Sequence, residues 1–254
     1  MPVEDGVGFG DLTPLKLKHF RAIVSMHIKI AMAVLQRNTF YNQVYHYIDA
    51  NAGPGKRVEN GEVVRGSPLI FIDTAETMNL RYRATLIERD IGNEASLRSS
   101  LPELTNGSIV THCADQAECL RQILDTRDER ELGLLFVDPT GIPDFDTVAY
   151  VSEMRPKMEI LMYVQATGIK RVRQYTGEQL SDFVARVGKE YWLVRKPVSW
   201  DRFQFTFLLG SNASLFTDYK KIDFYRLESS EAQGFFPKLN YTKSEQVQRL
   251  SRKL

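Results

Sequence analysis

The sequence lacks the features that mark membrane, secreted and disulfide-linked proteins. No apolar run approaches the ~18 to 20 residues that a membrane span needs, since polar residues interrupt the richest stretch, 23–35. The first ten residues hold neither a basic leader nor an apolar core. The chain has 254 residues but only 2 cysteines, too few for a disulfide scaffold. We therefore expect a cytoplasmic protein with reduced thiols and no membrane contact.

An excess of charge of one sign is also missing. The chain has 33 Lys and Arg against 32 Asp and Glu, which gives a net charge of +1. This balance argues against coating of nucleic acid by bulk electrostatics, but it allows a local basic face. No repeat or Pro/Gly/Ser-rich linker divides the chain. We therefore expect a single domain (1–254) with a core at 13–210 and a C-terminal appendage at 211–254.

Several catalytic signatures are absent as well. Cys113 and Cys119 flank Asp115, but no His, Cys and carboxylate group has the spacing of a metal site. We predict no bound metal and two thiols in the core. Ser67 lies in a Gly-Ser-Pro sequence rather than in a nucleophile elbow, so a serine hydrolase is not supported. Ser67 fits the N-cap of a helix, with Pro68 at the first helical position.

What is present is a regular alternation of segments typical of strands and helices. The continuous apolar run at 132–138 is typical of a strand buried on both faces of a parallel sheet. The alternation predicts an α/β fold, a doubly wound, mostly parallel Rossmann-like sheet with an N-terminal helix. We expect helices at 13–35, from 67 onward, and at 92–100, 116–125, 145–154 and 177–187, and strands at 44–49, 83–88, 107–112, 132–138, 159–165 and 203–209.

In such sheets ligands bind beyond the carboxyl ends of the strands. The turn after the first predicted strand holds Gly53 and Gly55, which allow a close approach of the backbone to a ligand. It is not a Walker phosphate loop, because Ala50 stands at the position of the first glycine. A dinucleotide fingerprint also fails, because Val58 replaces the third glycine.

Acidic residues follow four successive predicted strands. A carboxylate at the end of the second strand is suited to accept ribose hydroxyls. Each acid also has a structural explanation, as a helix cap or a turn residue. The four acidic strand ends, in a sequence that lacks a pyrophosphate-binding loop, together favour S-adenosylmethionine over NAD or ATP as the cofactor. The four acids are Asp49, Glu88, Asp115 and Asp138.

Four runs of the sequence resemble the three-Cys-motif partner proteins (TcmP), which look like class I S-adenosylmethionine-dependent methyltransferases. The runs are 47–55, 66–70, 87–90 and 136–141, and Thr13-Pro14-Leu15-Lys16 is similar to the start of that family. The resemblance spans about residues 13–171. It implies a cofactor site made of Asp49, Ala52, Gly53, Gly55, Glu88 and Asp115, and it implies that Asp138 and the carbonyl of Pro139 hold the acceptor amine.

A more distant resemblance links the chain to methyltransferases of the exocyclic amine of adenine. Their motif is Asp/Asn-Pro-Pro-aromatic, in which the ring stacks on a flipped base. Thr140 and Gly141 replace the second proline and the ring here. Stacking would then have to come from Phe145, or from Tyr163 or Tyr175 in neighbouring loops.

Basic residues gather in the first helix, in the predicted loop after the fifth strand, and in the tail. Cations with nearby aromatic rings suit phosphate contacts and base stacking. The tail, which contains Lys238, Lys243, Arg249, Arg252 and Lys253, is either an arm toward a partner or a surface helix. The predicted substrate-binding residues are Lys16, Thr140, Lys170, Arg171 and Arg173.

These features predict a methyltransferase that acts on nucleic acid, DNA or RNA, with the adenine amine as the favoured acceptor. Ordinary solvated faces also explain the basic segments. Two alternatives stay open. One is a degenerate methyltransferase fold that binds nucleic acid or a partner protein, and the other is an enzyme that uses S-adenosylmethionine on a protein or small molecule, or consumes it.

Overall fold

The computed structural model describes residues 13–59, 61–200, 203–214 and 219–251. They form two compact units, one ending at Phe136 and one beginning at Val137. The organisation into one domain with a core at 13–210 stays a prediction. In the part of the chain that the structure describes, no helix has the length and apolar character needed to cross a membrane.

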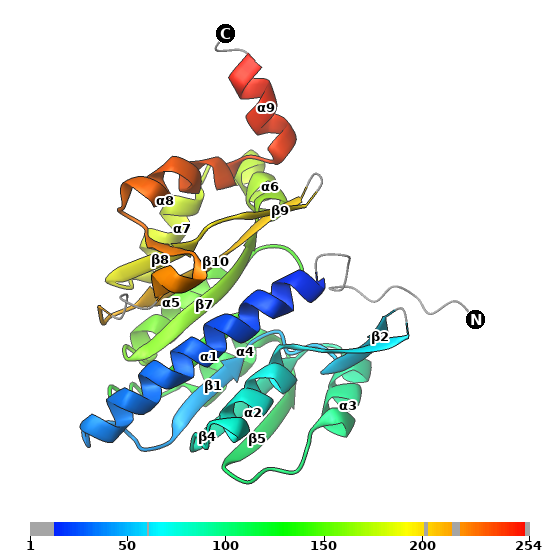
Figure 1. Cartoon of the computed structure of the whole chain (residues 1–254), viewed down its shortest axis with the longest axis vertical. Helices are drawn as coiled ribbons and strands as arrows, with labels where there is room; N and C mark the ends of the chain where they lie inside the picture. The colour runs from blue at the N-terminus through cyan, green and yellow to red at the C-terminus, as the bar shows by residue number, and fades with distance from the viewer. Residues whose placement is uncertain (1–12, 60, 201–202, 215–218, 252–254) are drawn as a thin grey trace. The chain divides into compact units, whose positions relative to one another are not determined.

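The first unit alternates strands and helices, apart from one β-hairpin (Figure 1). Its helices and strands are α1 (Thr13–Arg37), β1 (Tyr45–Asp49), β2 (Lys56–Glu59), β3 (Glu62–Arg65), α2 (Ser67–Thr77), β4 (Tyr82–Glu88), α3 (Ile91–Ser100), β5 (Gly107–Cys113), α4 (Gln116–Ile123) and β6 (Gly133–Val137).

The sheet of the first unit is parallel, in the order β6-β1-β4-β5. Every residue of β1 and β6 is buried, as expected for the central strands of such a sheet. The core on one face is aromatic. Phe71 of α2 stacks on Tyr47 with ring centroids 3.9 Å apart, and Phe20 of α1 lies 4.4 Å from Phe136. These rings fasten α1 and α2 side by side over β1 (Figure 1).

The second unit has an antiparallel sheet in the order β7-β10-β8-β11, with β9 paired to β10. Phe145 of α5 stacks on Phe183 of α7 at 4.6 Å, which packs these two helices together. Its elements are α5 (Phe145–Met154), β7 (Met158–Gln165), α6 (Ala166–Thr176), α7 (Leu180–Val187), β8 (Tyr191–Arg195), β9 (Val198–Trp200), β10 (Phe203–Ser211), η1 (Tyr219–Ile222), β11 (Phe224–Arg226), α8 (Ser230–Phe235), η2 (Phe236–Asn240) and α9 (Lys243–Ser251).

The predicted α/β, Rossmann-like fold is confirmed, and the predicted strands agree with β1, β4, β5, β6, β7 and β10 to within a few residues. The later strands depart from the expectation of a mostly parallel sheet, because β10 pairs antiparallel with β7 and β8, and β11 pairs antiparallel with β8. The β2–β3 hairpin was not predicted. An Asn-Gly pair between two short β-prone runs, at positions 60–61, is a signal that would have identified it.

The prediction for residues 166–187 was wrong in one respect. The expected loop after β7 is the helix α6, and Gly177 ends this helix instead of beginning the next one. Gly177 has φ +77°, the left-handed conformation in which helices commonly stop. The expected cap of α2 also differs, since Gly66 occupies the N-cap position and Ser67 is the first helical residue.

Candidate cofactor and acceptor sites

Three parallel strands of the first unit bring their carboxyl ends to one edge. Asp49 ends β1, Glu88 ends β4, and Asp115 follows β5 by two residues. The strands are in register, with Asp49 opposite Leu86 and Glu88 opposite Cys113. Parallel pairing therefore groups three of the four predicted acids of this kind at one edge of one sheet.

The Asp49 side chain stabilises the turn after β1 from the buried side of the turn. Its side chain is fully buried, and its two oxygens accept hydrogen bonds from the Tyr47 hydroxyl at 2.8 Å and the Asn51 amide at 3.2 Å. Ala52, also buried, donates its backbone N–H to the Ile87 carbonyl at 2.9 Å. These bonds fix the turn against β4.

The two glycines of this turn, Gly53 and Gly55, have different structural roles. Gly53 has φ +65°, and a Cβ built on it would meet nothing within 4 Å, so the turn is open on that side. Gly55 has φ +77°, and a Cβ there would lie 2.9 Å from a methyl carbon of Leu97. Gly55 thus allows α3 to pack against the turn, and Gly53 leaves space for a ligand.

Glu88 joins the turn to the next strand end. One carboxylate oxygen accepts from the Gly53 N–H at 2.8 Å, and the other accepts from the Asp90 N–H at 2.8 Å. Each oxygen keeps a second lone pair, so the half-buried carboxylate still has capacity for two hydroxyl donors. This is the capacity that a ribose diol needs.

Asp115 is the N-cap of α4. Its Oδ1 accepts from the N–H groups of Ala117 at 2.9 Å and Glu118 at 3.4 Å. Both bonds use the same oxygen of an exposed side chain, so capping occupies one side of the carboxylate. Nearby in sequence, Ile91 begins α3 directly after the cap residue Asp90 and is 77% exposed. Ile91 was not predicted as a site residue, although its position as an apolar residue just after an acidic strand end is visible in the sequence.

The predicted acceptor residues lie in the second unit, in the loop between β6 and α5. Asp138 and Pro139 are half-buried, and Thr140 is exposed. Asp138 acts on Tyr163 of β7, since burial and the nearby Asp138 charge raise the pKa of that phenol. Gly141 has φ +130° and open space at its Cβ position.

The acceptor loop packs tightly on α6. A Cβ on Gly168 would lie 2.8 Å from the Gly141 carbonyl oxygen and 2.7 Å from a methyl carbon of Ile142. Only glycine allows this approach of helix and loop. Lys170 and Arg171 follow Gly168 within one helical turn, so these cations lie on the helix that packs against residues 141–142 of the loop.

None of the three residues expected to stack on a base lies in a loop, and two of them are unsuited to stacking. Phe145 is buried against Phe183. Tyr163 belongs to β7 and is buried beside Phe205. Tyr175, in the last turn of α6, is 90% exposed. Of these three rings, Tyr175 alone has its faces accessible.

The predicted phosphate-binding cations differ in their surroundings. Lys16 lies half-buried in the first turns of α1, and Arg171 is exposed. Lys170 and Arg173 both pair with Glu245 of α9, at 3.5 and 3.4 Å. Glu245 lies 72 residues from Arg173 in the sequence, and it was not singled out by the sequence analysis. Arg252 and Lys253 lie outside the described residues.

Cysteines and metal-binding groups add little to the site. Cys119 is buried, as expected, but Cys113, the last residue of the edge strand β5, is exposed. Within the ranges described, no cluster of three or more His, Cys, Asp or Glu side chains is arranged to hold a metal ion.

No protein-family model and no curated protein sequence matches the chain. Solved structures do resemble it in fold. A probable spermidine synthase from Corynebacterium glutamicum ATCC 13032 matches with a TM-score of 0.55 and 12% identity, over 85% of this chain and 77% of that one. Protein LPL1258 from Legionella pneumophila str. Philadelphia 1, of the DUF519 family, matches with a TM-score of 0.54 and 13% identity, over 87% and 94%. The chain therefore shares its α/β fold with these two proteins.

Proposed function

We propose that the chain is an S-adenosylmethionine-dependent methyltransferase that acts on an amine of nucleic acid, with the exocyclic amine of adenine as the favoured acceptor. The observation that carries the proposal is the edge formed by the ends of β1, β4 and β5, where the Glu88 carboxylate is bonded to the open Gly53 turn. The class I methyltransferase-like fold supports it, and so does the sequence resemblance to the TcmP proteins.

The residues at this edge fit the adenosyl part of the cofactor. Glu88 has free lone pairs for a ribose diol, and Asp115 has an oxygen that capping does not use. Ile91 offers an exposed apolar side chain for the face of adenine. Gly53 leaves room for the methionine part beside the turn. Asp49 supports the turn from the buried side rather than by direct contact.

When bound, S-adenosylmethionine supplies a methyl group on a sulfonium, which an amine nitrogen accepts by in-line displacement. The contribution of the protein is to orient that nitrogen, a positioning effect. Asp138 would accept one N–H of the amine and the Pro139 carbonyl the other. The methylated amine would have to lose a proton, and the Asp138 carboxylate would receive it.

Calorimetric titration with S-adenosylmethionine and with S-adenosylhomocysteine tests cofactor binding. We expect a 1:1 complex in the micromolar range, typical of enzyme ligands. Absence of binding by the folded protein at about millimolar ligand, where even weak complexes form, would contradict the proposal.

Asp138→Ala tests the acceptor role. We expect cofactor affinity to stay within about twofold and methyl transfer to fall at least about a hundredfold, the usual contribution of a catalytic acid or base. Transfer is measured with labelled cofactor and pools of RNA, DNA, protein and small polyamines. Glu153→Gln, an exposed change in α5, is the matched control and should alter neither quantity. Loss of cofactor affinity in Asp138→Ala would instead assign Asp138 to the cofactor site.

A further inference from the structure

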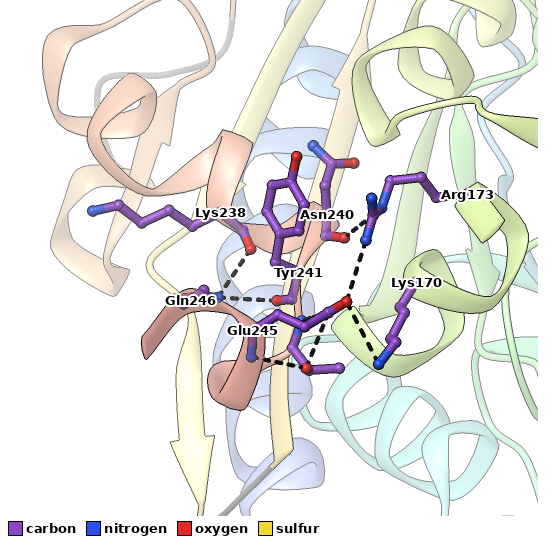
Figure 2. A network of polar contacts seen from close by, with 8 residues as sticks. Lys170, Arg173, Lys238, Asn240, Tyr241, Glu245 and Gln246 are labelled. Carbon is purple, nitrogen blue, oxygen red and sulfur yellow. Dashed lines mark hydrogen bonds and ion pairs between the residues drawn. The ribbon is translucent and has the colours of Figure 1, made fainter. Parts of the chain in front are cut away.

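The basic face of α6 is covered by a carboxylate from the C-terminal segment (Figure 2). Glu245 Oε1 lies 3.5 Å from Lys170 Nζ and 3.4 Å from Arg173 Nη2. Arg173 also donates from Nε to the Asn240 carbonyl at 3.1 Å. One acidic oxygen thus sits between two cations, which is the arrangement that these cations would give to a phosphate oxygen.

The other oxygen of Glu245 serves its own helix. Oε2 accepts from the Thr242 N–H at 2.8 Å and from the Thr242 hydroxyl at 3.0 Å, which is half of a capping box at the start of α9. The capping role needs an acceptor but no charge. The charge of Glu245 is therefore available for the contact with α6 alone.

The described side chains of helix α9 make only partly exposed contacts with the rest of the second unit. The helix has 9 residues, fewer than an isolated helix needs in water, and none of its described side chains is buried. Gln246 bonds the carbonyls of Lys238 and Tyr241 (Figure 2). It also bonds the side chain of Gln204, and Arg249 lies over the Tyr241 ring. Partly exposed ion pairs contribute little free energy and weaken in salt. A competing polyanion can therefore replace Glu245 at low cost.

Aromatic rings accompany the cations. The guanidinium groups of Arg173 and Arg249 lie over the Tyr241 ring, 4.4 and 3.7 Å from its centroid. Tyr175 stands one turn after Arg171 on the exposed side of α6, with both faces of its ring accessible. Cations that track a backbone, with rings on which bases stack, are the elements of a single-strand binding surface.

We propose that Glu245 occupies a phosphate site in the free protein, and that a single strand of nucleic acid binds α6 by displacing α9. The class of substrate rests on the proposed function, and the contact itself rests on the geometry of the second unit. Helix α9 is then an autoinhibitory segment, whose release exposes Lys170 and Arg173.

Fluorescence anisotropy with a labelled single-stranded 12-mer, as RNA and as DNA, tests this inference without cofactor. Glu245→Gln keeps the capping acceptor but removes the charge, and we expect it to tighten binding about fivefold, the effect of removing a competing ion pair worth about 1 kcal/mol. Glu231→Gln is the matched control, since Glu231 is also a first-turn glutamate, in α8 of the same unit. It should leave the affinity unchanged.

Two further measurements identify the ligand and the displacement. Tyr175→Ala should weaken strand binding at least about fivefold, the low end for a stacked base, without changing heparin binding. Deuterium exchange of amides 243–251 should accelerate when the strand binds. An unchanged strand affinity in Glu245→Gln, slower exchange of α9 on binding, or equal binding of poly-glutamate would each overturn the inference.

The calorimetric titration with cofactor separates the two proposals. Strand binding that tightens in Glu245→Gln, in a protein that binds no cofactor, would support the strand site and reject the methyltransferase. Cofactor binding with an unchanged strand affinity would reject displacement of α9 and leave the methyltransferase standing.

Discussion

At the scale of single residues, Asp115 has two roles that one substitution can separate. Its Oδ1 caps α4, and the same carboxylate is the proposed partner of the adenine amine. Asparagine is as good an N-cap as aspartate. The amide would keep the capping oxygen but present a donor in place of the second acceptor.

Asp115→Asn should therefore leave the unfolding midpoint unchanged and weaken cofactor binding about five- to tenfold, the cost of one unmatched hydrogen bond. Thermal unfolding and calorimetry measure the two quantities. Asp144→Asn, at the N-cap of α5, is the matched control for the capping effect. An unchanged cofactor affinity in Asp115→Asn would leave Asp115 with the cap role alone.

At the scale of elements, the contact between α6 and the acceptor loop depends on one missing side chain. Gly168→Ala would place a Cβ 2.8 Å from the Gly141 carbonyl oxygen, and a backbone atom cannot yield as a side chain can. Helix and loop would have to separate. The substitution should therefore shift the position of Asp138, although the substitution itself is in α6.

We expect Gly168→Ala to lower the free energy of unfolding by about 2 kcal/mol, as overpacking does, and to reduce methyl transfer more than cofactor affinity. Gly234→Ala in α8 is the control. It meets nothing within 4 Å, and alanine should raise the stability of this helix by about 0.5 kcal/mol. Urea denaturation checks both values, and equal effects of the two substitutions would be contrary to this account.

The elements also show what the sequence could predict. Strand ends were predictable, because a buried strand and the polar residue after it are local patterns, as at Glu88. Helix α6 was not predicted, because a glycine before an apolar run is compatible with a helix start, whereas the positive φ of Gly177 ends a helix. The Glu245 contact could not be predicted, since it joins residues 72 positions apart and no local pattern specifies which residue Glu245 contacts.

At the scale of the whole molecule, the net charge is near zero, but the pKa shifts of two buried groups predict opposite effects of acid on the stability of the two units. In the first unit, burial lowers the pKa of His27 to about 4 from 6.5, so its contribution to stability is present above pH 6.5 and is lost as the pH falls toward 4. In the second, burial raises the pKa of Glu159 to about 7, so its contribution is present below pH 4.5 and is lost as the pH rises through 7.

Between pH 6.5 and 4.5 the first unit should therefore lose stability while the second gains it. Complete protonation of His27 would cost about 3 kcal/mol for a pKa shift of this size. Deuterium exchange of β1 and β7 amides across this pH range measures the two units separately. His27→Leu should abolish the loss in β1, and Glu159→Gln the gain in β7. Parallel changes in both units would show that other groups dominate.

The missing side chain at Gly168 has a consequence for how a target position would be chosen. Because a Cβ at position 168 has no room beside the Gly141 carbonyl oxygen, the backbone of α6 lies at a close, set spacing from the acceptor loop. A strand held at Lys170 by a phosphate would then present at Asp138 a nucleotide from a narrow range of positions along the strand. Target choice would then follow from counting along the strand rather than from recognition of neighbouring bases.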